Sequence, residues 1–135
     1  MADYFDTSAL AKLVMAENET QALRRWIADR GDVPSVTCDL TRTELMLAVR
    51  RIDPDLLVRV REVLDGLTIV EVSTALFNAA GRLEPPTMRS LDAIHLAAAL
   101  DLGDDLDVLV AYDERLAAAA RSHGLDVAHP GLIES

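Results

Sequence analysis

Short apolar runs alternate along the chain with longer segments whose apolar residues recur every three or four positions. The first pattern is typical of buried strands and the second of amphipathic helices. The predicted strands span residues 2–5, 34–38, 68–72, 107–112 and 126–129. The predicted helices span residues 8–17, 20–29, 40–51, 54–65, 74–83, 91–102 and 114–123. Because the two alternate, we expect βαβ units and an α/β fold, with a mostly parallel sheet of four to five strands flanked by helices.

Polar residues that favour helix starts precede most of the predicted helices. The predicted N-caps are Thr7 or Ser8, Asp39, Asp53, Ser73 and Ser90. The pair Pro85-Pro86 predicts a loop over residues 84–89. In the helix that follows this loop, six residues at helical spacing are expected to form the buried stripe: Leu91, Ile94, His95, Ala98, Ala99 and Leu102. No repeat or interdomain linker interrupts the pattern, so we expect a single domain over residues 1–135.

Composition narrows the class of protein. Half of the residues are hydrophobic but only 4% are aromatic, so the core must consist mainly of aliphatic side chains. Cys38 is the only cysteine, which excludes an internal disulfide and favours a cytoplasmic setting. No apolar run approaches the roughly 20 residues of a membrane span. Asp3, Asp6 and Lys12 interrupt what would otherwise be a signal peptide.

The net charge of −10 argues against a surface that binds polyanions in general. It does not exclude a metal-dependent nuclease, in which acidic side chains gather around cations and the cations meet the phosphate.

Four carboxylates occupy positions where they could share one site. Asp6 follows the first predicted strand and Asp113 follows the fourth, and ligands of open α/β sheets bind at the carboxyl ends of strands. Asp92 lies in the first turn of its helix, beside the apolar stripe. Each of these residues alone has an ordinary structural explanation, either as an N-cap or as a charge that complements a helix dipole.

Glu44 is harder to explain in that way. It lies at the edge of the apolar stripe formed by Leu45, Ala48, Val49 and Ile52. An unpaired carboxylate there would be costly, so we expect a cationic group to meet it. Taken together, Asp6, Glu44, Asp92 and Asp113 indicate a site for a hard cation such as Mg²⁺ or Mn²⁺, which favours oxygen ligands.

Two other acidic, Mg²⁺-binding classes do not fit the chain. A phospho-receiver domain needs a lysine late in the chain, but Lys12 is the only lysine. A phosphatase with a D-x-D-x-T motif is also excluded. If Asp6 were the second acid of that motif, residue 4 would have to be Asp, but it is Tyr4. If Asp6 were the first acid, residue 8 would have to be Asp, but it is Ser8.

Four motifs, in their order and spacing, resemble those of the PIN-domain ribonucleases. They are YFDTSAL, RTELM, SLDAIHLAAAL and VAYDERLAAAA. The resemblance covers essentially the whole chain and is greatest to VapC, the toxin half of bacterial VapBC toxin–antitoxin pairs. It implies a PIN-like fold with an acidic site for Mg²⁺ or Mn²⁺, whose catalytic and metal-binding residues would be Asp6, Glu44, Asp92 and Asp113. The hydroxyl residue that supports the first acid would be Ser8, or alternatively Thr7.

The same resemblance implies a function. It predicts a metal-dependent endoribonuclease of a type II toxin–antitoxin system that hydrolyses phosphodiester bonds in structured RNA, such as tRNA or rRNA, and inhibits translation. It also implies a homodimer and a VapB-type antitoxin as partner. The alternative is a PIN fold that acts only as a non-catalytic binding or regulatory partner.

Several further residues remain open at this point. Arg42 and Arg89 precede two of the acids and could contact RNA or the antitoxin, or could be exposed solubilising residues. Trp26 is a candidate contact for a second protein. His95 is interpreted as a hydrogen-bonded core residue rather than a metal ligand, and Cys38 is expected to pack in the core. His123 and His129 have no recognisable partner pattern.

Overall fold

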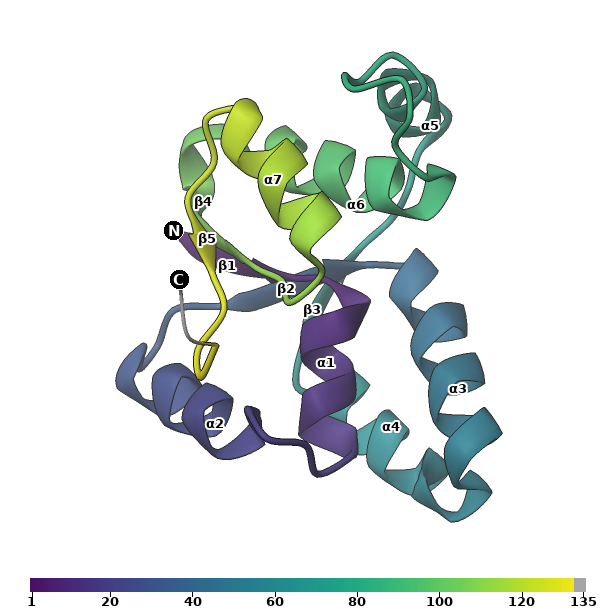
Figure 1. The fold of residues 1–135 in the computed structure, drawn as a ribbon, viewed down its shortest axis with the longest axis vertical. Coiled ribbons are helices and arrows are strands. Elements are labelled where there is room, and N and C mark those ends of the chain that lie inside the picture. Colours follow the sequence, from purple (N-terminus) through teal and green to yellow (C-terminus); the bar gives the residue numbers. More distant parts are fainter. Residues whose placement is uncertain (133–135) are drawn as a thin grey trace.

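The computed structural model describes residues 1–132 and contains a five-stranded sheet (Figure 1). Its strands are β1 (Ala2–Phe5), β2 (Ser35–Cys38), β3 (Thr68–Val70), β4 (Leu106–Val110) and β5 (Val127–Ala128). Their order is β3-β2-β1-β4-β5, and every neighbouring pair is parallel. This confirms the predicted α/β class. From β1 the chain adds strands β2 and β3 on one side of the sheet, and then β4 and β5 on the other side of β1. The carboxyl ends of β1 and β4 therefore form the switch point at which such sheets bind ligands.

Seven α-helices cover the sheet in the described part of the chain. They are α1 (Thr7–Val14), α2 (Thr20–Asp29), α3 (Leu40–Ile52), α4 (Leu57–Asp65), α5 (Thr74–Ala80), α6 (Ser90–Asp101) and α7 (Glu114–Ser122). Figure 1 shows α5, α6 and α7 on one side of the sheet and α1 to α4 on the other. Within residues 1–132, no helix is both long and apolar enough to cross a membrane.

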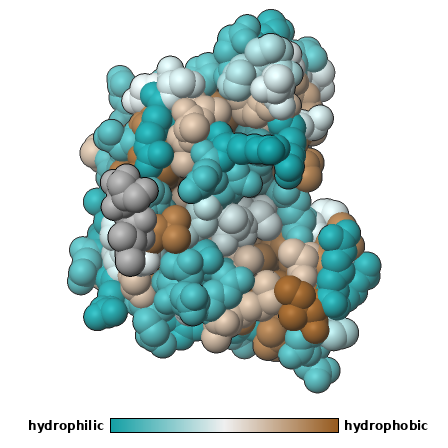
Figure 2. Space-filling view, viewed as in Figure 1, coloured by the Kyte–Doolittle hydropathy of each residue, from teal (hydrophilic) through white to brown (hydrophobic). Residues whose placement is uncertain are grey.

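Two apolar clusters lie on opposite faces of the sheet. Successive side chains of a strand point to opposite faces, so Tyr4 packs against α5, α6 and α7 while Phe5 packs against α1 to α4. Both clusters consist mainly of Leu, Val and Ala. The surface seen in Figure 2 is largely hydrophilic, and its outline is notched between the part formed by α5 and α6 and the part formed by α3.

The structure corrects several predicted helix starts. Asp6, not Thr7 or Ser8, is the N-cap of α1 and accepts a hydrogen bond from the Ala9 amide. Asp39 precedes α3 but makes no capping hydrogen bond. Ser90 is the first residue of α6 rather than its cap. Asp53 and Ser73 do cap, although Asp53 caps a short 3₁₀ helix (Pro54–Leu56) that leads into α4.

Other differences concern helix ends and faces. Helix α1 stops at Val14 and α5 at Ala80, each three residues short of the predicted end. The predicted stripe of α6 is only partly correct: Leu91 is 45% exposed, whereas Ala93, Leu96 and Ala97 are buried. Helix α6 packs against β2, β4, α5 and α7, so burial around it is wider than one stripe.

Candidate functional site

Asp6 lies where β1 ends and α1 begins. Its Oδ1 accepts hydrogen bonds from the Ser8 hydroxyl at 2.7 Å and from the Ala9 amide at 3.1 Å, which explains why the helix starts there. The side chain is only 4% exposed. Burial disfavours its charged form and raises the pKa of Asp6 to about 6, although the Ser8 hydroxyl partly opposes this shift.

Ser8 also joins the two strands of the switch point. Its Oγ accepts a hydrogen bond of 3.0 Å from the amide of Tyr112, just beyond β4. The next residue, Asp113, caps α7 and accepts bonds from the amides of Arg115 and Leu116. Its charge raises the pKa values of both Asp6 and Asp92, so the three carboxylates are within electrostatic range of one another. The ordinary explanation of Asp113 as a cap is therefore correct, and it does not exclude a second role.

Glu44 reaches the site from α3. Its Oε1 accepts a hydrogen bond of 2.7 Å from the Thr7 hydroxyl and lies 2.6 Å from Nε2 of His95. These partners lower the pKa of Glu44, against the effect of its burial. The sequence predicted a cationic group beside Glu44, and the structure identifies that group as His95.

His95 extends the site into the core. It is 2% exposed, and its Nδ1 lies 2.8 Å from the Tyr4 hydroxyl. Burial alone would lower the pKa of His95, but hydrogen bonding to Cys38 and Glu44 raises it instead. We attribute the rise chiefly to Glu44, because its oxygen lies 2.6 Å from the ring whereas the Cys38 sulfur lies 3.9 Å away. His95, predicted as a core histidine, therefore also holds the predicted site residue Glu44 in place.

Asp92 approaches from the first turn of α6. It is half-buried, and burial followed by repulsion from Asp113 raises its pKa. The charge of Glu44 acts on it in the same direction. Four carboxylates from the end of β1, α3, α6 and the end of β4 are therefore electrostatically linked.

These carboxylates suit a hydrated hard cation better than a closed cage of protein ligands. Within residues 1–132, no three Asp, Glu, His or Cys side chains are grouped closely enough to hold a metal ion by themselves. Mg²⁺ usually keeps several waters and takes only one or two carboxylates directly. The donors are all oxygens, and a cation would relieve the burial and repulsion that raise the pKa values of Asp6 and Asp92. The residues present therefore fit Mg²⁺ or Mn²⁺.

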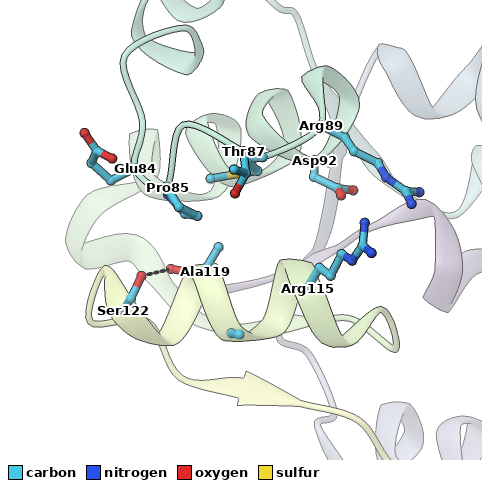
Figure 3. Close-up of a pocket in the computed structure, with 10 residues that line it drawn as sticks. Glu84, Pro85, Thr87, Arg89, Asp92, Arg115, Ala119 and Ser122 are labelled. Carbon is cyan, nitrogen blue, oxygen red and sulfur yellow. Dashed lines mark hydrogen bonds between the residues drawn. The ribbon is translucent and has the colours of Figure 1, made fainter.

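An open cavity of about 740 Å³ adjoins Asp92 (Figure 3). Arg89 and Arg115 flank Asp92 along its wall. Arg42, by contrast, does not line this cavity and lies 3.4 Å from Asp39 in an exposed ion pair. Sequence reasoning identified Arg89 but missed Arg115, whose only signal was its place two residues after Asp113.

Comparisons with known proteins identify the family of the chain. Residues 4–122 match the family model described as PIN domain. The chain is 42% identical over 134 residues to "Ribonuclease VapC47" of Mycobacterium tuberculosis (strain CDC 1551 / Oshkosh), covering 96% of this chain and 98% of that protein. It is 40% identical over 129 residues to "Ribonuclease VapC46" of M. tuberculosis (strain ATCC 25618 / H37Rv), covering 96% and 98%.

Solved structures share the fold at lower identity. The crystal structure of M. tuberculosis VapC20, described as a sarcin-ricin loop cleaving toxin, matches with a TM-score of 0.74 at 17% identity, covering 87% of this chain and 95% of that one. A toxin–antitoxin complex from Klebsiella pneumoniae matches with a TM-score of 0.70 at 20% identity, covering 96% and 98%. VapBC2 from Rickettsia felis, bound to a promoter DNA fragment, matches with a TM-score of 0.71 at 13% identity, covering 95% and 98%. The chain therefore belongs to the PIN-domain family, and within it is a VapC-like ribonuclease homologue.

Proposed function

We propose that this protein is a Mg²⁺- or Mn²⁺-dependent endoribonuclease and the toxin of a type II VapBC pair. It would hydrolyse phosphodiester bonds in structured RNA, either tRNA or rRNA, and so inhibit translation in the cytoplasm. One observation carries the proposal: four carboxylates from distant parts of the chain interact at the switch point of the sheet, and two of them have raised pKa values. The ribonuclease names of relatives with 40–42% identity support the same activity.

Each acid has a proposed role. Asp6 and Asp92 would be the primary ligands of the cation, directly or through water, while Glu44 and Asp113 would complete the coordination or orient the attacking water. The chemistry that such a cation supplies when bound is activation of water and neutralisation of charge on the phosphoryl oxygens.

The hydroxyl residues and the histidine would hold these acids in place. Ser8 donates to Asp6, and Thr7 donates to Glu44. His95 contacts the same Glu44 oxygen and is itself held by Tyr4. Such supporting contacts limit the rotation of the carboxylates, and their loss in metal enzymes typically reduces metal affinity or activity by about 10- to 100-fold.

A VapB-type antitoxin and a second copy of the chain are the proposed protein partners. The titles of two structures that share the fold name a toxin–antitoxin complex and a VapBC assembly, which supports the first. Trp26 is a weak candidate for either contact, because its ring packs edge-on against Phe5, with centroids 6.4 Å apart, and beneath Arg30. Light scattering with and without a co-expressed antitoxin would determine both assemblies.

The activity can be tested with the purified chain and total RNA in Mn²⁺, in Mg²⁺ and in a chelator. We expect cleavage in the metals only, and its loss in Asp6→Asn. Asp65→Asn is the matched control, because exposed Asp65 ends α4 at the opposite edge of the sheet. Cleavage in the chelator would refute the metal dependence, and equal cleavage by both variants would refute the role of Asp6. Absence of cleavage under all three conditions would leave a non-catalytic binding partner as the better explanation. Sequencing RNA 5′ ends after induced expression would then identify the target.

A further inference from the structure

The cavity beside Asp92 has walls that are held in place without a ligand. It lies between the 84–89 loop, the start of α6 and helix α7 (Figure 3). Nε2 of His123, at the end of α7, lies 2.8 Å from the Glu84 carbonyl oxygen, and the Met88 amide donates to the Pro85 carbonyl at 3.0 Å. The first contact ties the loop to α7 and the second closes a turn within it, so the cavity is largely preformed.

Two arginines line the end of this cavity nearest to Asp92. In Figure 3 the guanidinium groups of Arg89 and Arg115 lie on the same side as the Asp92 carboxylate. Within residues 1–132, neither guanidinium makes a hydrogen bond or a salt bridge, although the positive charge of Arg89 partly offsets the rise in the pKa of Asp92. In a chain with 23 acidic and 13 basic residues, both arginines line one cavity together with a carboxylate of the proposed site. Guanidinium groups bind phosphate in a planar, bidentate way.

The rest of the wall has a different character. Pro85, Met88, Ala118 and Ala119 supply apolar surface, Thr87 supplies a hydroxyl, and Glu84 supplies a carboxylate at the end away from Asp92. The Ser122 hydroxyl donates to the Ala119 carbonyl at 2.7 Å, so its oxygen remains free only to accept. The volume of about 740 Å³ lies within the roughly 300–1,000 Å³ of small-molecule sites. A cationic end joined to an apolar interior matches a phosphate joined to a base.

We infer that this cavity binds one nucleotide of the RNA, adjacent to the bond that is cleaved. Its phosphate lies between Arg89 and Arg115, and its base packs against Met88, Pro85 and Ala119. The inference rests on the proposed function, because Asp92 lines the cavity and belongs to the proposed cleavage site. A base can enter only if it is unpaired and unstacked, which is how proteins most often read RNA sequence. The cavity therefore selects single-stranded or looped RNA at this position.

A metal-free titration tests the inference separately from catalysis. The four nucleoside 5′-monophosphates, the matching nucleosides and inorganic phosphate are added in a chelator to ¹⁵N- and methyl-labelled protein, and NMR follows the Nε–Hε signals of Arg89 and Arg115 and the Met88 methyl. We expect saturable shifts of all three signals with at least one monophosphate. Nucleosides should bind more weakly, and phosphate should shift the arginines without shifting Met88. Arg89→Ala and Arg115→Ala should each weaken binding by roughly 10- to 100-fold, the range for a hydrogen bond to a charged group.

Arg61→Ala is the matched control, since Arg61 is exposed on α4 at the opposite face of the sheet. No saturable shift, or equal losses in Arg61→Ala and the two cavity variants, would overturn the nucleotide site. Equal affinities for phosphate and every monophosphate, with Met88 unmoved, would overturn the base-binding part. Because no metal or cleavage is involved, a protein that fails to cut RNA can still pass this test, and one that cuts RNA can fail it.

Discussion

His95 Nε2 lies 2.6 Å from Oε1 of Glu44, and the two residues come from helices that are 51 positions apart in the chain. His95 is fully enclosed by the core, whereas the side chain of Glu44 is 20% exposed. The opposite ring nitrogen meets the Tyr4 hydroxyl at 2.8 Å. The interior of the protein is thereby linked through one imidazole to a carboxylate at the edge of the proposed cleavage site.

His95→Ala should therefore lower both stability and activity. The change removes a buried ring and its hydrogen bond with the Tyr4 hydroxyl, and Glu44 keeps only the Thr7 hydroxyl. We expect a loss of about 3 kcal/mol in the free energy of unfolding, measured with urea. His95→Gln places an amide near the position of Nε2 and can keep the contact with Glu44, so it should lose less in both respects. A His95→Ala protein of wild-type stability would show that the contact is unimportant.

The stability of the metal-free protein should depend on pH through Asp6. Its pKa is raised from 3.8 to about 6, so between these values the folded state binds more protons than the unfolded state. Stability contributed by this proton is present at low pH and is lost as pH rises through about 6. At about 1.4 kcal/mol per pKa unit, the loss is on the order of 3 kcal/mol.

Urea unfolding of wild type and Asp6→Asn in a chelator, at pH 4 and pH 7.5, measures this difference directly. The variant cannot titrate at this position, so it should gain stability relative to wild type at the higher pH. A difference between the two proteins that is the same at both pH values would contradict the raised pKa.

Asp92→Asn should raise the melting temperature of the metal-free protein. Burial and the charge of Asp113 both disfavour the ionised form of Asp92, and the amide removes that charge with little change of shape. Excess Mn²⁺ should favour wild type over the variant. At about 100 times its dissociation constant, Mn²⁺ should stabilise wild type by ~2.7 kcal/mol and the variant much less. Thermal melting of both proteins in chelator and in Mn²⁺ provides the four midpoints. If Asp92 only complements the dipole of α6, the variant should melt lower and the metal shifts should be equal.

Two substitutions at Asp113 should separate its cap from its charge. Oδ1 of Asp113 accepts bonds from the Arg115 and Leu116 amides, and asparagine caps helices about as well as aspartate. Asp113→Asn should therefore keep the stability of the protein, while Asp113→Ala should lose about 1 kcal/mol. Both should lose RNA cleavage. Activity that survives in Asp113→Asn would restrict this residue to capping.

The sequence by itself determined the class of fold and indicated the four acids of the proposed site. Hydrophobic periodicity and helix caps are local properties, so alternating strands and helices could be read from neighbouring residues. Parallel strands align their carboxyl ends, and for this reason Asp6 and Asp113 could be expected at one edge. The position of Glu44 on its helix was enough to predict that it would need a partner.

Only the tertiary structure decided which groups meet these acids. That His95 is the partner of Glu44, that Ser8 reaches the Tyr112 amide, and that Arg115 joins Arg89 at one cavity all depend on how separate elements pack. Helical periodicity predicts which face of a helix is buried, but not the neighbour against which it is buried. Packing also decides that Asp6, and not Thr7 or Ser8, caps α1. All three residue types can cap a helix, and the position at which β1 leaves the sheet determines which of them does so.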